Sequence, residues 1–528
     1  MKRTPACSLL FATGMAVACA VQAQELARTP WWPWWRGPHR DNVVPAGTTT
    51  VAAPWNGKGP LKLWESVRIP SYQEGGLASA VVADSRVYLF ATPIITTPVS
   101  TRKFSEADLQ RIGVFPAVLP DEVAAEVEKA RLSDERAALS PREVRQWAES
   151  TMQKLLPSPQ DRSRYGGFVV DRLSRGASAL PLDVIKTLTQ LKDTLFESEQ
   201  ALAEWLDSHG ISGAPKQTVL NASPRTVSTM EDMFVCLNAD DGTVVWQKRF
   251  PGRLLTYGGS STPCVARGRL YGIGSTGSVY CLNAATGETI WTVQGTGEEC
   301  HSSVVALDNL AIVQKGALTA YDAATGAVVW TLQEAHAMNN TPAVWTSGGA
   351  TYLLCNSGSS LRCVDLAGKI LWRARGGSYS TPAVSGDRCV VFTGRQLVAY
   401  RISISGAQLL WQVDASPDRG ASPVIWQDCA YLAENGRALC VELETGKVVW
   451  DIAVPASECG SAVIADGKLL AVGNRCLIVL AASPQKAEVV CTLPFPVAPC
   501  VTPAIAGNQM FLRLNNSVAC YDLSRPAP

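Results

Sequence analysis

Residues 235–246 read VCLNADDGTVVW: an apolar strand, a turn containing glycine, and a short apolar run that ends in tryptophan. The same pattern returns in YCLNAATGETIW up to Trp291, TAYDAATGAVVW up to Trp330, RCVDLAGKILW up to Trp372, AYRISISGAQLLW up to Trp411 and LCVELETGKVVW up to Trp450. The tryptophans lie about 40 residues apart, which is the length of four short strands and their turns, or one propeller blade. A helical repeat is disfavoured because the segments alternate with period two and are rich in Val, Thr and Tyr.

A second signature, Ser or Thr usually followed by Pro, comes after each tryptophan. It occurs at Ser261-Thr262-Pro263, Asn340-Thr341-Pro342, Ser380-Thr381-Pro382, Ala421-Ser422-Pro423 and Val501-Thr502-Pro503, and without Pro at Ser79-Ala80, Ser302-Ser303 and Ser461-Ala462. Because Pro at the first residue of a strand removes no ladder hydrogen bond, this signature should open the innermost strand of a blade. Eight such signatures match eight tryptophan-type strand ends, if Trp64 is included and Cys491 takes the tryptophan position.

The order of the two signatures predicts the topology. A tryptophan-type strand near residues 61–67 precedes the first inner strand, and no such strand follows the last inner strand near residues 500–506. We therefore predict an all-β, eight-bladed β-propeller closed by an N-terminal strand, which leaves no open sheet edge between the ends. The tryptophans expected to pack between adjacent blades are Trp64, Trp246, Trp291, Trp330, Trp372, Trp411 and Trp450.

The first blade is interrupted by a segment with helical patterning. Ser140-Pro141-Arg142-Glu143 is a capping box with Pro at the first helical position, and further short helical runs lie at 105–112 and 121–132. A stripe of Leu182, Ile185, Leu188, Leu191, Leu195 and Leu202 indicates one more helix ending at Gly210, and Arg162–Gly167 is a candidate contact loop between helices. The predicted division is a signal peptide at 1–23, an N-terminal extension at 24–54, propeller at 55–95, a helical insertion in the first blade at 96–230, and propeller at 231–528.

Charge and the N-terminus indicate the compartment. The 47 basic and 46 acidic residues leave a formal net charge of +1, so no cluster points to nucleic acid or an anionic membrane surface. Residues 1–23 combine Lys2 and Arg3, an apolar run and a small-residue cleavage site, as in export signals, and no later run is long enough to span a bilayer. A periplasmic or secreted protein is predicted, with no lipid on Cys19 because Ala16 replaces the usual larger apolar residue.

Five of the 16 cysteines occupy one structural position in the repeat. Cys236, Cys281, Cys363, Cys440 and Cys520 share one position, which holds Ala in two other copies, so they are interpreted as small core residues. Cys300, Cys459 and Cys500 instead stand just before inner-strand starts. The candidate ligand surface at the channel mouth is Ser260, Cys300, His301, Asn339, Asn340, Tyr379, Cys459 and Cys500. Cys459 and Cys500 could form a disulfide, hold a metal or remain thiols, and four scattered histidines give no metal signature.

These motifs resemble the pyrroloquinoline-quinone-like (PQQ-like) propeller repeats over residues 55–525 outside the insertion. Trp35-Arg36-Gly37-Pro38-His39-Arg40-Asp41 also resembles the W-R-G-P-x-R-D opening of exported bacterial proteins with this repeat. The superfamily includes quinone-dependent alcohol dehydrogenases and the non-catalytic propeller BamB of the outer-membrane protein assembly machine. The resemblance implies the fold but does not decide between these functions.

Departures from the dehydrogenase pattern decide the expected function. The dehydrogenases use a vicinal Cys-Cys disulfide, a calcium held by Glu and Asn, and a catalytic Asp, whereas this chain has no Cys-Cys pair. We therefore predict an exported, non-catalytic binding or scaffolding module with no cofactor, which contacts a protein or small ligand through its channel face and helical insertion. The alternative is a quinone-dependent oxidoreductase of the alcohol dehydrogenase type that binds PQQ and calcium.

Overall fold

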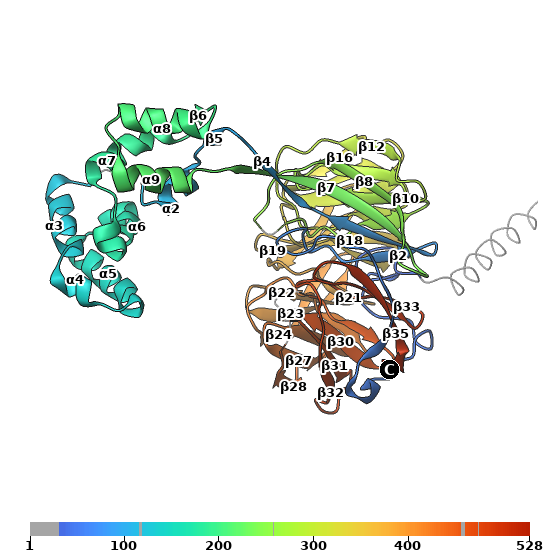
Figure 1. Ribbon diagram of the computed structural model, residues 1–528. Helices are drawn as coiled ribbons and strands as arrows, with labels where there is room; N and C mark the ends of the chain where they lie inside the picture. Colours follow the sequence, from blue (N-terminus) through green and yellow to red (C-terminus); the bar gives the residue numbers. More distant parts are fainter. Residues whose placement is uncertain (1–30, 116–118, 257, 456–459, 474) are drawn as a thin grey trace, which may run out of the picture. The chain divides into compact units, whose positions relative to one another are not determined.

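A computed structural model describes residues 31–115, 119–256, 258–455, 460–473 and 475–528 (Figure 1). The predicted signal peptide and Cys19 lie outside these residues. The described residues divide into two compact units: those within 96–228 form one, and those within 31–95 and 229–528 form the other. Each unit has its own apolar core.

The larger unit is built from small antiparallel sheets, numbered here by the order of their first strands. Sheet 1 contains β2 (Val81–Ala83), β3 (Arg86–Ala91), β7 (Thr226–Asn238) and β8 (Val244–Pro251), with β4 (Ile94–Pro98) also paired to β7. Sheet 2 contains β9 (Cys264–Ala266), β10 (Arg269–Ile273), β11 (Val279–Asn283) and β12 (Thr289–Val293). Sheet 3 contains β13 (Val305–Leu307), β14 (Leu310–Lys315), β15 (Ala317–Asp322) and β16 (Val328–Leu332). Sheet 4 contains β17 (Ala343–Ser347), β18 (Ala350–Ser357), β19 (Ser360–Asp365) and β20 (Ile370–Arg375).

The second half of this unit repeats the same arrangement. Sheet 5 contains β21 (Ala383–Ser385), β22 (Arg388–Phe392), β23 (Gln396–Ser403) and β24 (Gly406–Asp414). Sheet 6 contains β25 (Val424–Trp426), β26 (Cys429–Glu434), β27 (Arg437–Glu442) and β28 (Val448–Ala453). Sheet 7 contains β29 (Val463–Ala465), β30 (Lys468–Gly473), β31 (Cys476–Ala481) and β32 (Val489–Pro494). Sheet 8 contains β33 (Ala504–Ala506), β34 (Gln509–Arg513), β35 (Val518–Pro526) and, from the other end of the chain, β1 (Pro60–Glu65), which pairs antiparallel with β35.

The repeat position shared by the five cysteines lies directly opposite the tryptophan in the register of the sheets. Cys236 pairs with Trp246, Cys440 with Trp450 and Cys520 with Trp64, and a register shift next to each pair bends the strand. All five cysteines are buried with free thiols. A small side chain here leaves room for the neighbouring indole ring, which explains why Ala and Cys alternate at this position.

The seven repeat tryptophans connect each sheet to the next. Each indole N–H donates a hydrogen bond of 2.7–3.1 Å to a backbone carbonyl of the following sheet: Trp64 to Ala239, Trp246 to Ala284, Trp291 to Ala323, Trp330 to Leu366, Trp372 to Ser403, Trp411 to Leu443 and Trp450 to Ser483. In five of the seven cases the ring also covers the glycine of that sheet's turn, namely Gly242, Gly287, Gly326, Gly368 and Gly446. At Gly446, where φ is +75°, an added Cβ would lie 2.5 Å from the Trp411 side chain, so both the conformation and the space require glycine.

Sheet 7 lacks this tryptophan because Cys491 takes its position, opposite Val479. The missing contact to sheet 8 comes from elsewhere in the chain. Trp55, in a short 3-10 turn (Trp55–Gly57) before β1, is buried and donates its indole N–H to the carbonyl of Leu523 at 2.7 Å. Leu523 is the counterpart of Ala239 in sheet 1, three residues after the shared cysteine position. Trp55 therefore supplies the eighth indole contact.

The Ser/Thr signature links the first strands of the sheets through side-chain hydroxyls. In seven hydrogen bonds of 2.8–3.1 Å, the backbone N–H of one signature donates to the hydroxyl of the next: Ser79 to Thr262, Thr262 to Ser303, Ser303 to Thr341, Thr341 to Thr381, Thr381 to Ser422, Ser422 to Ser461, and Thr502 to Ser79. The last of these joins sheet 8 to sheet 1. Ser303, and not Ser302, is the member from sheet 3.

The smaller unit is helical. It contains α2 (Glu106–Arg111), α3 (Asp121–Arg131), α4 (Asp134–Ala138), α5 (Pro141–Leu155), α6 (Pro159–Arg175), the 3-10 turn η2 (Gly176–Ser178), α7 (Leu182–Leu188), the 3-10 turn η3 (Thr189–Leu191), α8 (Glu199–Ser208) and α9 (Gly213–Ala222), with a two-stranded sheet of β5 (Arg102–Lys103) and β6 (Leu195–Phe196). The capping box at Ser140 and Glu143 is present at the start of α5. None of the described helices is long and apolar enough to cross a membrane.

Two expectations for this segment were wrong. Arg162–Gly167 is not a loop, because it lies inside α6, which Ser158 caps and where Gly166 packs close to Met152. The stripe from Leu182 to Leu202 is not one helix. Asp193 adopts a left-handed conformation with φ +60°, and the Ser198 side chain caps the N-terminus of α8, so the chain leaves the helix and Leu195 is exposed.

Candidate functional site

The antiparallel sheets place two kinds of connection at opposite edges. Within each sheet, the turn between the first and second strands and the turn between the third and fourth strands lie at the same edge, which we call the turn edge. The connections that enter each first strand lie at the other edge. We call the second the connection edge. Its described residues are 66–80, 252–256, 258–263, 294–304, 333–342, 376–382, 415–423, 454–455, 460–462 and 495–503. Loops held by a rigid sheet scaffold are a common place for binding residues, and the predicted ligand surface falls here.

The predicted surface residues differ in accessibility. Tyr379 is 56% exposed, and Ser260, His301 and Asn339 are partly exposed. Cys300 and Asn340 were predicted wrongly as surface residues, because both are buried. The Cys300 thiol contacts the Ser302 hydroxyl and the Gln314 carbonyl, and the Asn340 amide donates to the Ser378 carbonyl at 3.0 Å.

The two remaining cysteines of the prediction have different outcomes. Cys500 is disulfide-bonded, which is one of the three alternatives that the sequence left open for it, and the free thiol and the metal ligand no longer apply. Cys459 lies outside the described residues, and its pairing with Cys500 stays a prediction. Among the residues that the structure describes, no group of three or more His, Cys, Asp or Glu side chains could hold a metal ion.

Ser260 and His301 lie on the connections that enter sheets 2 and 3, and their side chains are in contact. The hydroxyl of Ser260 lies 2.7 Å from His301 Nδ1, and His301 Nε2 lies 3.0 Å from a carboxylate oxygen of Glu299. The His301 side chain is 18% exposed and that of Glu299 is 31% exposed. Burial lowers the pKa of His301, although the charge and hydrogen bond of Glu299 act in the opposite direction. A partly buried serine, histidine and carboxylate thus lie in one hydrogen-bonded chain.

Polar side chains near the ends of the second strands hold the connections in place. Arg513 at the end of β34 is fully buried and donates to the hydroxyl of Ser71 and to the carbonyls of Pro70, Gly75, Ala78 and Phe90. Burial lowers the pKa of its guanidinium to about 9. These bonds fix the connection that enters sheet 1. No sequence pattern pointed to them, because Arg513 stands alone in an otherwise apolar strand.

Glu434, at the end of β26, fixes the connection that enters sheet 6. One of its carboxylate oxygens accepts hydrogen bonds from the backbone N–H groups of Arg419 and Ala421, while the other has no partner among the described residues. Asp418 in the same connection accepts from the backbone of Tyr379 and Ser380. Burial, followed by the nearby Asp418 charge, raises the pKa of Glu434 to about 8.

The segment that carries W-R-G-P-x-R-D runs among the first strands. Arg36 is buried and donates to the carbonyls of Pro382 and Pro423, the prolines that precede the first strands of sheets 5 and 6. Arg40 lies 4.0 Å from the Trp34 ring centre and donates to Ala306 in sheet 3. Further backbone bonds join the segment to Val82, Val265 and Ile464 in sheets 1, 2 and 7. Residues 32–44, which include this motif, therefore form hydrogen bonds with six of the sheets.

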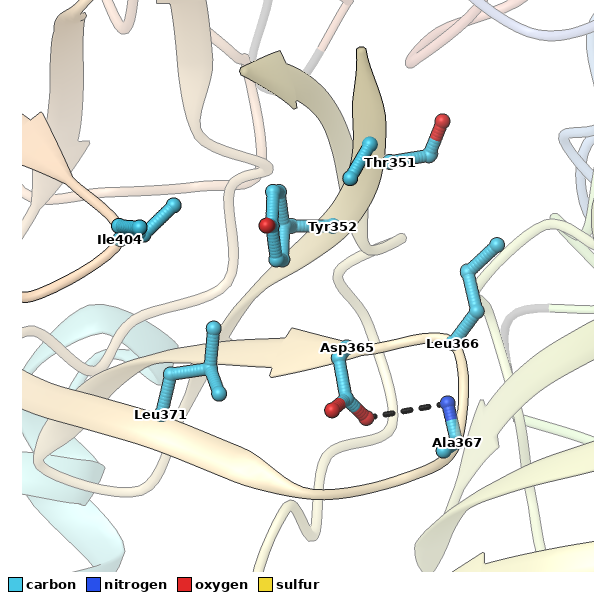
Figure 2. Close-up of a pocket in the computed structure, with 8 residues that line it drawn as sticks. Thr351, Tyr352, Asp365, Leu366, Ala367, Leu371 and Ile404 are labelled. Atoms are coloured by element: carbon cyan, nitrogen blue, oxygen red, sulfur yellow. Dashed lines mark hydrogen bonds between the residues drawn. The ribbon is translucent and has the colours of Figure 1, made fainter. Parts of the chain in front are cut away.

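A separate groove lies at the turn edge of sheet 4 (Figure 2). It has a volume of about 530 Å³, and its lining includes Tyr352, Asp365, Leu371 and Ile404. Figure 2 shows the Tyr352 ring in the middle, with the other three side chains around it. Ile404 is 56% exposed, and one Asp365 oxygen accepts the backbone N–H of Ala367 at 3.0 Å. This groove is at the opposite edge from the predicted ligand surface, and the sequence analysis did not identify it.

Repeated four-stranded sheets, most of them linked to the next by an indole and a hydroxyl, are the architecture of a PQQ-like repeat protein. The sequence profile of the family described as outer membrane protein assembly factor BamB matches residues 198–343 and 314–525, which together make up more than half of the chain. The chain belongs to this family.

Solved structures give a more distant likeness. BamB from Moraxella catarrhalis is 13% identical with a TM-score of 0.46, and the match covers 56% of this chain and 91% of that one. The quinohemoprotein alcohol dehydrogenase ADHIIG from Pseudomonas putida HK5 is 12% identical with a TM-score of 0.43, covering 57% and 74%. The computationally designed protein Ika8 is 8% identical with a TM-score of 0.42, covering 56% and 93%. No curated protein matches the sequence.

Proposed function

We propose that the chain is an exported binding or scaffolding module of the cell envelope, built as an eight-bladed propeller with β1 completing the last blade. Sheets 1 to 8 are the blades in this proposal, and residues 96–230 are a helical insertion in the first. The proposal is supported by the hydroxyl hydrogen bonds that run from sheet to sheet and return from Thr502 to Ser79, and by the pairing of β1 with β35. Residues 1–23 are proposed as the export signal that directs the chain to the periplasm or the outside.

The observation that carries a function without quinone chemistry is the position of the N-terminal segment. Trp34, Trp35 and Arg36 fill the space between the first strands of sheets 3, 4 and 5 and leave about 10 Å³, no more than a single water molecule needs. A three-ring quinone does not fit in that space. The absence of a vicinal Cys-Cys pair from the sequence points the same way.

The connection edge is the proposed binding surface, for a protein or a small ligand. Exposed apolar side chains stand on connections of four sheets, at Tyr72, Leu254, Met338 and Tyr379. Apolar side chains left in water on neighbouring rigid loops are typical of contact surfaces. The helical unit, grafted between two strands of sheet 1, is proposed as a second contact surface.

Two experiments test this proposal. Adding PQQ and calcium to the purified protein should produce neither dye-linked alcohol oxidation nor a new absorption band, and the appearance of both would make the chain a quinone-dependent oxidoreductase. A photo-crosslinking residue at Tyr379 should capture an envelope partner in cells. The same residue at Ile404, which is equally exposed at the turn edge, serves as the matched control. Capture at Ile404 alone would move the binding surface to the groove of Figure 2.

A further inference from the structure

The connection between β8 and β9 holds Ser260 in a fixed place. Gly258 has a φ of +71°, and an added Cβ would lie 2.7 Å from the backbone of Gly76. The backbone N–H of Gly259 donates to the Thr92 hydroxyl at 2.9 Å, and its carbonyl accepts from Leu77 at 2.8 Å. Ser260 follows directly, so the contacts of Gly258 and Gly259 anchor the backbone that presents its hydroxyl.

Backbone hydrogen bonds also fix His301, which lies on the neighbouring connection. The backbone N–H groups of His301 and Ser302 both donate to the Met338 carbonyl, at 2.7 and 3.1 Å. Ser303, two residues further on, belongs to the hydroxyl chain that links the sheets. Because His301 and Ser260 both stand two residues before their hydroxyl-chain members, the repeat itself sets them side by side.

The hydrogen bonds determine which imidazole nitrogen carries the proton. A carboxylate only accepts hydrogen bonds, so His301 Nε2 must donate to Glu299 at 3.0 Å. In the neutral ring Nδ1 then has a free lone pair, which accepts the Ser260 hydroxyl proton at 2.7 Å. Burial lowers the pKa of His301, which keeps the ring neutral at pH 7. An activated serine, a neutral base and a carboxylate that orients the base are the three parts of nucleophilic acyl transfer.

We propose that Ser260, His301 and Glu299 form an acyl-transfer site that hydrolyses carboxylic esters at the connection edge. This activity goes beyond the proposed binding function, which excludes only quinone chemistry. All three side chains are partly exposed, so an ester group reaches them directly from solvent.

The reaction is balanced without any further reagent. Ser260 Oγ bonds to the ester carbonyl carbon, and its proton moves to His301 Nδ1. The C–O bond to the alcohol then breaks, and the alcohol leaves with that proton. Water attacks the acyl-serine, gives a proton to Nδ1 and releases the acid, and the proton returns to Ser260 Oγ. Ser260 and His301 are the catalytic residues, and Glu299 is a positioning residue.

The test is made on the full chain with p-nitrophenyl acetate and a fluorophosphonate probe. We expect the probe to label Ser260 and the ester to give a burst of nitrophenol. Ser260→Ala should abolish both, and His301→Gln should slow acylation roughly 10²–10⁴-fold. Ser378→Ala is the matched control, because Ser378 is also partly exposed on the connection edge, and it should leave both unchanged.

The pH profile of acylation distinguishes a catalytic role of His301 from a purely structural role of its hydrogen bonds. Acylation should rise with pH as His301 loses its proton, with a midpoint below the ordinary histidine value near 6.5. Glu299→Gln should move the midpoint lower still, because Glu299 raises the pKa of His301. No probe label on Ser260, or a burst that survives in a folded Ser260→Ala chain, overturns the proposal. Neither result affects the quinone and crosslinking tests above.

Discussion

Replacing Glu434 by glutamine should remove a large part of the pH dependence of stability. Glu434 is fully buried, and burial together with Asp418 raises its pKa from 4.5 to about 8. Between these values the folded protein holds a proton on Glu434 that the unfolded chain has lost. The stabilisation of the folded state by this proton is therefore fully present below pH 4.5. It decreases as the pH rises and is lost once the pH passes about 8.

The size of the effect follows from the pKa difference. At about 1.4 kcal/mol per pH unit, a rise of the pKa from 4.5 to about 8 corresponds to about 5 kcal/mol between pH 4.5 and pH 9, as an upper value. The substituted glutamine would keep an oxygen for the N–H groups of Arg419 and Ala421, and would place an amide where Glu434 has an oxygen without a partner among the described residues. The variant should thus fold normally and gain stability over the parent above pH 8.

Urea unfolding at pH 5, 7 and 9 measures this difference. The midpoint of the parent should fall more steeply with pH than that of Glu434→Gln, and the two curves should diverge most at pH 9. Glu488→Gln is the control, because Glu488 is exposed and should leave the slope unchanged. Parallel curves for the parent and Glu434→Gln would show that Glu434 is already ionised in the folded protein, and would refute the reasoning.

Three further results are expected. Trp411→Ala should lower the free energy of unfolding by about 3–5 kcal/mol, because the indole is buried against the turn of sheet 6; a loss below about 1 kcal/mol in urea would contradict this role. Trp55→Phe should cost about 1 kcal/mol through the lost bond to Leu523, and Trp55→Ala several times more in the same assay. Thiol labelling of the denatured chain from residue 24 onward should count 12 thiols before reduction and 14 after it, with a Cys459–Cys500 peptide; 14 before reduction would be the wrong result.

The sequence could predict what repeats. Trp64, Trp246 and the others were recognised because the same side chain returns at a constant spacing with the same turn. The hydroxyl signature was recognised for the same reason, but its register was one residue off where Ser302 and Ser303 are both serines. The hydrogen bonds of Ser303 with Thr262 and Thr341 distinguish the two serines, and in this register Cys300 is buried.

Structural features that occur only once in the chain could not be predicted from the repeat. Trp55 replaces a missing repeat tryptophan from outside the repeat, so no spacing points to it. Arg513 and Glu434 fix different connections with different chemistry, so they share no pattern. The contact of Ser260 with His301 joins two connections 41 residues apart, and neither residue has a sequence neighbour that would reveal it.

The pairing of β1 with β35 has a consequence for how the chain is made. Trp55 and Leu523 are 468 residues apart, so β1 must wait for β35 to be synthesised before it can pair. A product that stops early leaves β1 unpaired and the Trp55 indole in water, both of which invite aggregation or proteolysis. We therefore expect chains that stop before β35 to be degraded faster than chains that include it.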